Sequence, residues 1–111
     1  GAHKDSQFGP VLVFGSGGQY VELVNDIQRV ILPAENEELY QMIFNTKAGA
    51  ILRGVRGQCP LDLRRLMDFI KLTADWIIEE PRIESLDFNP VRLYDHGLVA
   101  LDAKVTLYSK N

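Results

Sequence analysis

The sequence predicts an α+β fold in which an antiparallel sheet carries two helices packed on one face. Short apolar runs bounded by turn residues occupy both ends of the chain, and such runs are typical of strands. The middle of the chain instead places apolar residues three and four apart, which is the period of a helix. Because the strands at each end follow one another through short turns, we expect hairpin pairing and hence an antiparallel sheet.

Length and composition limit the possible classes of protein. The 111 residues leave room for one domain, 1–111, in which we expect residues 1–4 to form a tail. A net charge of −3 argues against a nucleic-acid partner, and no apolar run is long enough to cross a membrane. The single cysteine, Cys59, cannot form an internal disulfide, which fits a cytoplasmic protein.

The first third of the chain reads as strands. Residues 10–14 form an apolar run that predicts a buried strand, and a glycine-rich loop follows it. Residues 19–24 and 27–32 both have strand composition. The turn signal Asn25-Asp26 between them predicts a hairpin, which Pro33 ends.

Two helices follow. Asn36 is the expected N-cap of the first, and Gly49 is expected to stop it. We expect the second helix to begin at Pro60 and to end before Pro81. Its buried stripe is predicted from apolar residues at helical spacing: Leu63, Leu66, Met67, Ile70, Ala74, Ile77 and Ile78.

The last third predicts a β-hairpin whose register can be worked out. Residues 83–93 and 98–107 are strand-like and flank turn chemistry at residues 95–97. Half of the possible registers place the apolar side chains of both strands on one side of the sheet, and a loop of two or four residues gives such a register. A type I turn with a bulge at Gly97 gives the slipped pairing, which we reject because burial of the apolar row outweighs turn preference. The expected facing pairs are Phe88 with Ala103, Asp87 with Lys104, and Asn89 with Asp102.

This register places an amide oxygen and a carboxylate together on the polar side of the hairpin. The Cβ atoms of Asn89 and Asp102 would lie about 5 Å apart. Mg²⁺ prefers oxygen ligands of this kind, completed by water and substrate phosphate. The alternative is an ordinary solvated face on which Asp87 and Lys104 form an exposed ion pair.

The glycine-rich loop and one arginine are candidates for phosphate contact. Gly15, Ser16, Gly17 and Gly18 follow a strand and precede another strand, which excludes a dinucleotide-binding turn or a P-loop. The loop N–H groups could still approach an anion, or the glycines could serve a tight turn with positive φ. Arg56 lies beside glycine and is either a phosphate ligand or a surface arginine.

The remaining reactive side chains suggest no further chemistry. Cys59 precedes a proline at the expected start of a helix, but no second cysteine or nearby histidine supports a redox or nucleophilic role. His3 lies in the expected tail and His96 in the hairpin turn. Neither has an acid, base or metal partner in the sequence.

Several motifs, in their order and spacing, resemble one protein family over residues 5–107. They are Phe8-Gly9-Pro10-Val11, Phe14-Gly15-Ser16-Gly17-Gly18, Val21-Glu22, Gly54-Val55-Arg56-Gly57, Leu86-Asp87-Phe88-Asn89-Pro90-Val91 and Ala100-Leu101-Asp102-Ala103. The series is similar to the second, carboxy-terminal lobe of the ATP-grasp domain in NDP-forming acyl-CoA synthetases, such as acetate–CoA ligase (ADP-forming). These enzymes are related to the succinyl-CoA synthetase β subunit.

The resemblance implies ligands and partners. It implies a lobe that binds Mg²⁺ and ATP or ADP, with Asn89 and Asp102 as metal ligands and Asp87 as a nearby third carboxylate. Gly15, Gly17, Gly18 and Arg56 would lie on the phosphate side. It also implies partners that this sequence does not contain: the first ATP-grasp lobe, the phosphohistidine segment, and the CoA-binding domains or subunit.

The leading hypothesis is therefore a nucleotide- and Mg²⁺-binding lobe of an acyl-CoA synthetase, inactive as an isolated chain. The alternative is a non-catalytic binding or oligomerisation module derived from such a lobe, which would associate with itself through an exposed apolar face or strand edge. A third reading is the inactive synthetase-like domain of a protein acetyltransferase. The presence of Asn89 and Asp102 argues against that third reading.

Overall fold

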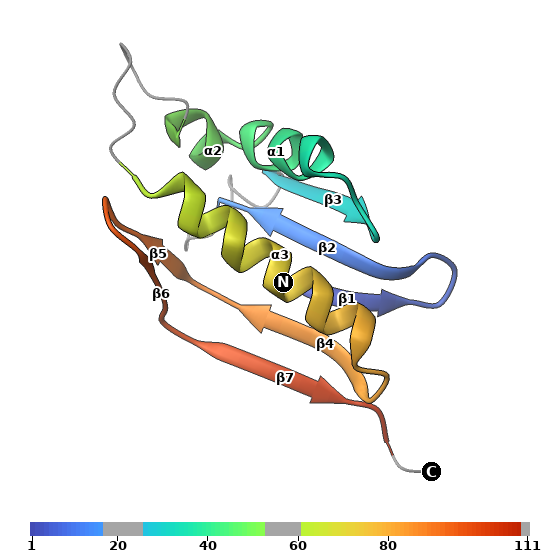
Figure 1. The fold of residues 1–111 in the computed structure, drawn as a ribbon. Coiled ribbons are helices and arrows are strands. Elements are labelled where there is room, and N and C mark those ends of the chain that lie inside the picture. The colour runs from blue at the N-terminus through green and yellow to red at the C-terminus, as the bar shows by residue number, and fades with distance from the viewer. Residues whose placement is uncertain (17–25, 53–60, 110–111) are drawn as a thin grey trace.

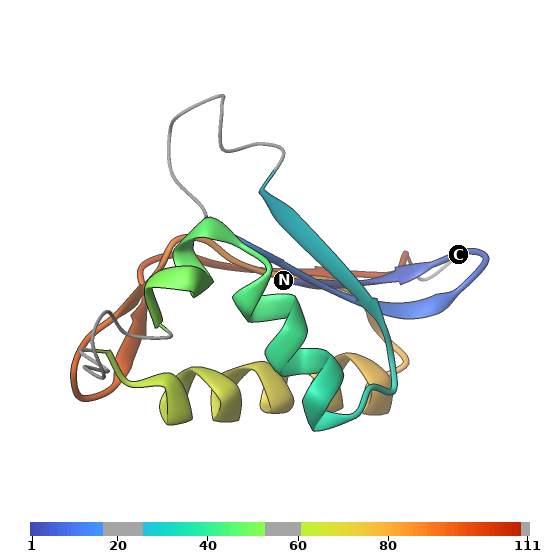
Figure 2. The ribbon, with the colours of Figure 1, turned by 90° about the horizontal axis from the view of Figure 1, so that it is seen from above.

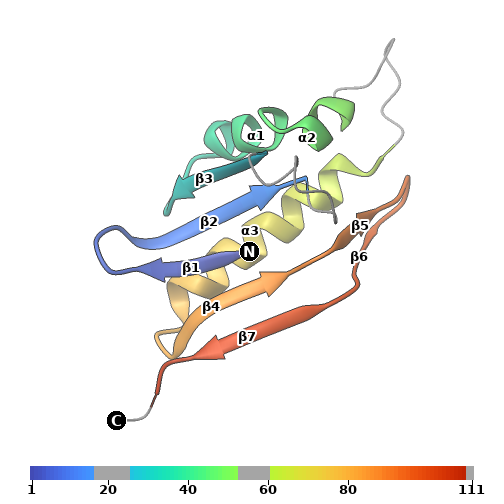
Figure 3. The ribbon, with the colours of Figure 1, turned by 180° about the vertical axis from the view of Figure 1, so that it is seen from behind.

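The computed structural model describes residues 1–16, 26–52 and 61–109. A five-stranded antiparallel sheet in the order β3-β2-β1-β4-β7 carries helices on one face, and β5 and β6 form a two-stranded extension. Figure 2 shows the helical layer on one side of the sheet, and Figure 3 shows the other face without helices. The strands are β1 (Ala2–Asp5), β2 (Gly9–Gly15), β3 (Ile27–Ile31), β4 (Ile83–Phe88), β5 (Val91–Leu93), β6 (Leu98–Ala100) and β7 (Ala103–Leu107). The helices are α1 (Asn36–Phe44), α2 (Lys47–Leu52) and α3 (Leu63–Glu79).

This arrangement confirms the predicted α+β class, but the described chain has three helices rather than two. The sequence interpretation ended the first helix at Gly49, which instead lies inside α2. A Cβ atom at Gly49 would overlap the carbonyl oxygen of Ile43 at the end of α1. The Thr46 hydroxyl lies between the two helices, where it donates to the Ile43 carbonyl and accepts the Gly49 N–H. Gly49 is therefore needed for close packing of α2 on α1, and is not a helix stop.

The predicted helix starts are each wrong by one or more residues. Helix α1 is capped by Glu35 rather than Asn36, in a capping box with Glu38. Helix α3 begins at Leu63, and the Asp62 side chain accepts the N–H of Arg65. Pro60 lies outside the described residues.

Helix α3 buries the predicted stripe against the sheet. Ile70 and Ile77 are buried, whereas Ile78 is 42% exposed and does not belong to the core. Burial of a side chain of this size contributes about 1.5–3 kcal/mol. The core also takes Leu39, Met42 and Ile43 from α1. No helix in the described parts of the chain is long and apolar enough to cross a membrane.

The beginning of the chain is a strand rather than the predicted tail. Strand β1 lies between β2 and β4, where Ala2 pairs with Leu12 on one side and with Leu86 on the other. Ala2 is only 3% exposed because these two neighbours and α3 cover it. The expected strand at residues 19–24, with its hairpin, lies outside the described residues.

The register predicted for the last hairpin is confirmed. Phe88 pairs with Ala103 and Asp87 with Lys104, as the apolar pattern required. The proposed ion pair between Asp87 and Lys104 does not form. The salt bridge found in the described structure joins Arg82 to Glu80 instead.

The predicted face alternation through residues 83–93 is wrong at two places. A register shift between Ile83 and Ser85 turns Ile83 to the same buried side as Leu86. The second break is at Asn89 and Pro90, because proline has no N–H to continue a ladder. Beyond it, β5 pairs with β6 as a separate ribbon, and Leu93 packs against the core.

Candidate functional site

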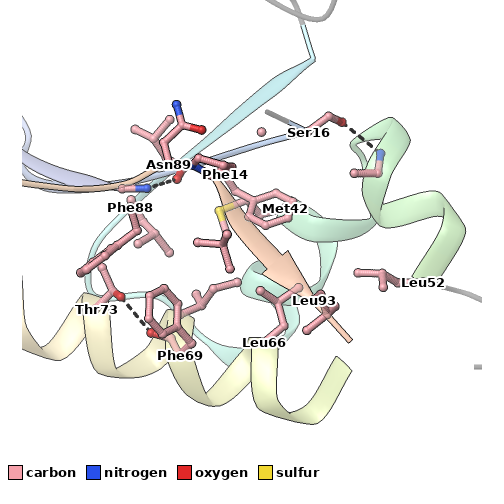
Figure 4. Close-up of a pocket in the computed structure, with 18 of the residues that line it drawn as sticks. Phe14, Ser16, Met42, Leu52, Leu66, Phe69, Thr73, Phe88, Asn89 and Leu93 are labelled. Atoms are coloured by element: carbon pink, nitrogen blue, oxygen red, sulfur yellow. Dashed lines mark hydrogen bonds between the residues drawn. The ribbon is translucent and has the colours of Figure 1, made fainter. Parts of the chain in front are cut away.

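The predicted metal pair lies where the hairpin leaves the main sheet. The Asn89 N–H donates to the Asp102 carbonyl at 3.1 Å, and the Leu101 N–H donates to the Pro90 carbonyl at 2.9 Å. These two bonds continue the register between β4–β7 and β5–β6. Asn89 and Asp102 are therefore direct neighbours across the ribbon, and both are exposed. In Figure 4 the Asn89 side chain points away from the helical layer.

The Asp102 carboxylate is hydrogen-bonded to the main chain of the next residue. Its Oδ1 accepts the N–H of Ala103 at 2.9 Å, which restrains the side chain at the start of β7. The other oxygen accepts no hydrogen bond within the described residues. Asp87 is exposed near the end of β4, two residues before Asn89, and is in register with Lys104.

The donor set fits a partly hydrated hard cation. Within residues 1–16, 26–52 and 61–109, no three His, Cys, Asp or Glu side chains gather closely enough to enclose a metal ion. Asn89 and Asp102 can offer one amide oxygen and one carboxylate. Mg²⁺ characteristically takes one or two protein carboxylates and fills its other positions with water and phosphate oxygens. The site is thus adequate for a Mg²⁺–nucleotide and insufficient for a closed protein cage.

A pocket of about 210 Å³ lies beside the pair, between the sheet and the helices. Asn89, Gly15 and Ser16 all line it, so Asn89 and the start of the glycine loop lie at the same pocket, while the Asn89 side chain points away from the helical layer. The interior is apolar, with Leu66 and Phe69 of α3 among its walls. A charged phosphate belongs at the polar rim of such a pocket and not inside it.

Gly15 ends β2 in extended backbone without a positive φ, so the tight-turn explanation does not apply to it. A Cβ atom at Gly15 would lie 3.2 Å from the Asp26 carbonyl oxygen and 3.2 Å from Ile27 Cγ1. Both contacts are tighter than ordinary packing. Glycine at this position allows β2 and β3 to approach closely at the base of the loop.

The residues on either side of segment 17–25 are joined by a hydrogen-bond cluster that the sequence interpretation missed. The Ser16 hydroxyl donates to an Asp26 carboxylate oxygen and accepts the Ala48 N–H at 3.0 Å. The Asp26 carboxylate also accepts the Lys47 N–H. Main-chain N–H groups in the first turn of α2 therefore hold both Ser16 and Asp26 in place. The Asn25-Asp26 signal suggested a turn, and nothing local indicated this contact with α2.

Asp62 is a second connection that the sequence did not reveal. Its carboxylate accepts the N–H of Gly97 at 2.6 Å and the N–H of Arg65 at 3.1 Å. The hydrogen bond from Gly97, followed by that from Arg65, lowers the pKa of Asp62 below its ordinary value. One carboxylate thus fastens the turn between β5 and β6 to the start of α3. The tip of the hairpin is held against the helical layer.

Most of the other candidate residues named from the sequence lie outside the described parts of the chain. Gly17, Gly18 and Arg56 lie outside the described residues, as does Cys59. His3 lies on β1 in register with Ser85 of β4, and His96 lies in the exposed turn. Asn89 therefore neighbours Asp102 across the ribbon and lines the same pocket as Gly15, and Asp87 lies two residues before it near the end of β4.

A family model described as an ATP-grasp domain matches residues 1–107. The chain belongs to the ATP-grasp family. The match covers every described helix and strand, and it agrees with the order of motifs read from the sequence.

Two relatives of this ATP-grasp chain are ADP-forming ligases. It is 36% identical to the beta subunit of acetate–CoA ligase [ADP-forming] I from Pyrococcus furiosus, with 96% of this chain and 46% of that subunit covered. It is 35% identical to acetate–CoA ligase [ADP-forming] I from Archaeoglobus fulgidus, with 96% of this chain and 16% of that protein covered. The chain thus spans about half of one relative and about a sixth of the other.

A solved structure shares the fold of this ATP-grasp chain. It is that of the dinucleotide-forming acetyl-coenzyme A synthetase 1 of Candidatus Korarchaeum cryptofilum, in complex with coenzyme A and Mg-AMPPCP. The TM-score is 0.84 at 34% identity, over 96% of this chain and 50% of that one. In that complex the phosphohistidine segment points towards the nucleotide-binding site.

Proposed function

We propose that this chain is the carboxy-terminal ATP-grasp lobe of an ADP-forming acyl-CoA synthetase and binds a Mg²⁺–nucleotide at Asn89 and Asp102. The observation that carries the proposal is the pairing of these two residues across the ribbon, beside Gly15. Their oxygens suit Mg²⁺, and the start of the glycine loop lies at the same pocket. The ADP-forming relatives and the solved structure in complex with Mg-AMPPCP support an enzyme that binds a Mg²⁺–nucleotide.

The proposed ligands would differ in charge and in the part of the Mg²⁺–nucleotide that they contact. Asp102 would supply the anionic ligand and Asn89 a neutral one, while Asp87 would add negative charge nearby. Gly15, Gly17, Gly18 and Arg56 would contact the phosphates through N–H groups and a guanidinium. When bound, Mg²⁺ neutralises phosphate oxygens as charge develops during phosphoryl transfer.

The complete reaction we propose interconverts acid, CoA and ATP with acyl-CoA, ADP and phosphate. It would need the first ATP-grasp lobe, the phosphohistidine segment and the CoA-binding domains, so the isolated chain would be inactive. We place the enzyme in the cytoplasm, in keeping with its single cysteine. The identity of the acyl group would be set by parts outside this lobe.

Turnover of the intact enzyme and calorimetric titration with Mg²⁺–ADP test the proposal. Asp102→Ala should abolish turnover and Mg²⁺–nucleotide binding while the circular dichroism spectrum stays unchanged. Asp95→Ala is the matched control, because Asp95 is also exposed and also accepts the N–H of the next residue through Oδ1, at 2.9 Å. That variant should behave as wild type. Near-normal turnover of Asp102→Ala would refute the metal assignment.

A further inference from the structure

A block of four polar residues lies where the last hairpin leaves the main sheet. Asp87 pairs with Lys104 in the β4–β7 ladder, and the hydrogen bond from the Asn89 N–H to the Asp102 carbonyl continues the same register. Because side chains alternate along a strand, the two residues that each strand gives to this block share one face. Lys104 is therefore the diagonal neighbour of Asn89, and it follows Asp102 by two residues.

This block lies on the face of the sheet opposite the helices. On the helix side, Leu86 of β4 is buried, and the Phe88 ring packs edge-to-face on Phe69 of α3 with centroids 5.0 Å apart. Asp87 and Asn89 alternate with these two residues of β4, so they point the other way. In Figure 4 the Asn89 side chain indeed points away from the helical layer, and Figure 3 shows no described helix over this face. A ligand can therefore approach the block from the open face.

The Lys104 ammonium group has no partner within the part of the chain that the structure describes. It is exposed, and it forms no ion pair with Asp87 although the two residues are in register. Strand β4 lies between β1 and β7. The Asp87 carboxylate lies towards the β1 side, because a Cβ atom at Gly1 would be 3.6 Å from Asp87 Oδ1. Lys104 thus keeps a free positive charge beside the predicted metal pair.

Edge strands often carry lysine for another reason, because its charge discourages pairing with a further strand. Strand β7 is such an edge of the five-stranded sheet (Figure 1). That role requires no particular position along the strand, whereas Lys104 lies beside Asn89 and Asp102. Without Lys104 the block would hold two carboxylates and no cation. Both carboxylates would then repel the phosphates of a nucleotide bound there.

We propose that Lys104 binds an oxygen of the terminal phosphate of a nucleoside diphosphate whose Mg²⁺ is held by Asn89 and Asp102. This inference rests on the function proposed above, because it needs the nucleotide at that pair. A lysine ammonium group carries three N–H donors on a flexible four-carbon stem and binds phosphate as a point charge. Lys104 would therefore favour a nucleoside diphosphate over a monophosphate, which lacks the phosphate that it contacts.

Calorimetric titration of the intact enzyme with ADP, in the presence and absence of Mg²⁺, tests the proposal. Lys104→Ala should weaken binding of Mg²⁺–ADP by about tenfold or more, because a hydrogen bond between charged groups is lost. The loss should persist without Mg²⁺, since the ammonium group contacts phosphate directly, and it should be smaller for AMP. Lys104→Arg keeps a cation with N–H donors and should stay within about threefold of wild type. Lys71→Ala removes the same charge from α3, in the helical layer, and is the matched control.

The Asp102→Ala variant separates this inference from the proposed function. Its loss of affinity should appear only with Mg²⁺, because that carboxylate acts on the nucleotide through the metal. Wild-type affinity in Lys104→Ala, with binding lost in Asp102→Ala, overturns the inference and leaves the metal assignment standing. A Lys104 effect that needs Mg²⁺, or that is equal for ADP and AMP, also overturns the inference. Wild-type affinity in Asp102→Ala, with weakened binding in Lys104→Ala, refutes the metal assignment and keeps the phosphate contact.

Discussion

The carboxylate of Asp26 accepts the main-chain N–H of Lys47 with both oxygens, at 2.9 and 3.1 Å. Together with the Ser16 hydroxyl, this contact joins both sides of segment 17–25 to α2. The positions of Ser16 and Asp26 are therefore set by a helix that contributes no residue to the predicted metal pair.

Asp26→Asn tests whether this connection matters for nucleotide binding, given the proposed function. The amide keeps one acceptor oxygen, and if that oxygen retains the Ser16 contact, the new NH2 donor faces the Lys47 N–H, so the cluster is weakened. We expect KM for the nucleotide in the intact enzyme to rise several-fold with a smaller change in kcat, and stability to fall by about 1 kcal/mol. Asp68→Asn on the exposed side of α3 is the control. An unchanged KM together with lowered stability would assign Asp26 a structural role only.

Asp62 predicts a pH-dependent difference in stability. Hydrogen bonds from Gly97 and then from Arg65 lower its pKa, so its ionised form is favoured in the folded state. Its contribution is therefore fully present above the unfolded value of about 4 and is lost as the pH falls through the folded pKa. Urea unfolding of wild type and Asp62→Asn should show a constant gap near neutrality that closes in acid. Asp68→Asn, which removes an exposed carboxylate from the same helix, is the matched control.

Glu80 should stay ionised well below the pH at which an ordinary glutamate titrates. Side-chain and then backbone hydrogen bonds from Arg82 lower the pKa of Glu80 to about 2. The stabilisation is present above the ordinary glutamate pKa and is lost only as the pH approaches the folded value. Carbon-detected NMR titration of the carboxyl group measures it directly. Arg82→Ala should return the pKa towards its ordinary value, whereas Lys104→Ala should leave it unchanged.

Gly49→Ala should destabilise the protein, although alanine usually favours a helix. The added methyl group would overlap the Ile43 carbonyl oxygen, and a backbone atom cannot move aside as a side chain can. We expect a loss of about 1–3 kcal/mol, the usual cost of overpacking. Thermal or urea unfolding measures this loss, and Gln41→Ala on the exposed face of α1 is the control. A gain in stability would show that α2 shifts to accommodate the methyl group.

The hairpin register was predictable because one physical requirement decided it. Only one parity of pairing keeps Leu86 and Phe88 on the apolar side, and a slip by one residue would expose both. That requirement alone places Asn89 opposite Asp102. It could not reveal the register shift at Glu84 or the break at Pro90, because both depend on how the ribbon bends against the rest of the sheet.

The missed features are those set by contacts distant in sequence. Helix α2 has six residues with a glycine inside, so propensity alone could not indicate it, and its packing on Ile43 explains it. Ala2 is buried because β2 and β4 lie on either side of it, which no local pattern in the first four residues could show. Asp26 and Asp62 act on main-chain N–H groups 21 and 35 residues away.

The breaks at residues 89–90 and 101–102 lie opposite one another, and the register is the same on both sides of them. The last hairpin is therefore a single ribbon creased across one line, and Asn89 and Asp102 stand on that line. The five-stranded sheet anchors the ribbon on one side of the crease, and the hydrogen bond from Gly97 to Asp62 anchors it on the other. The spacing between Asn89 and Asp102 is therefore fixed from both sides.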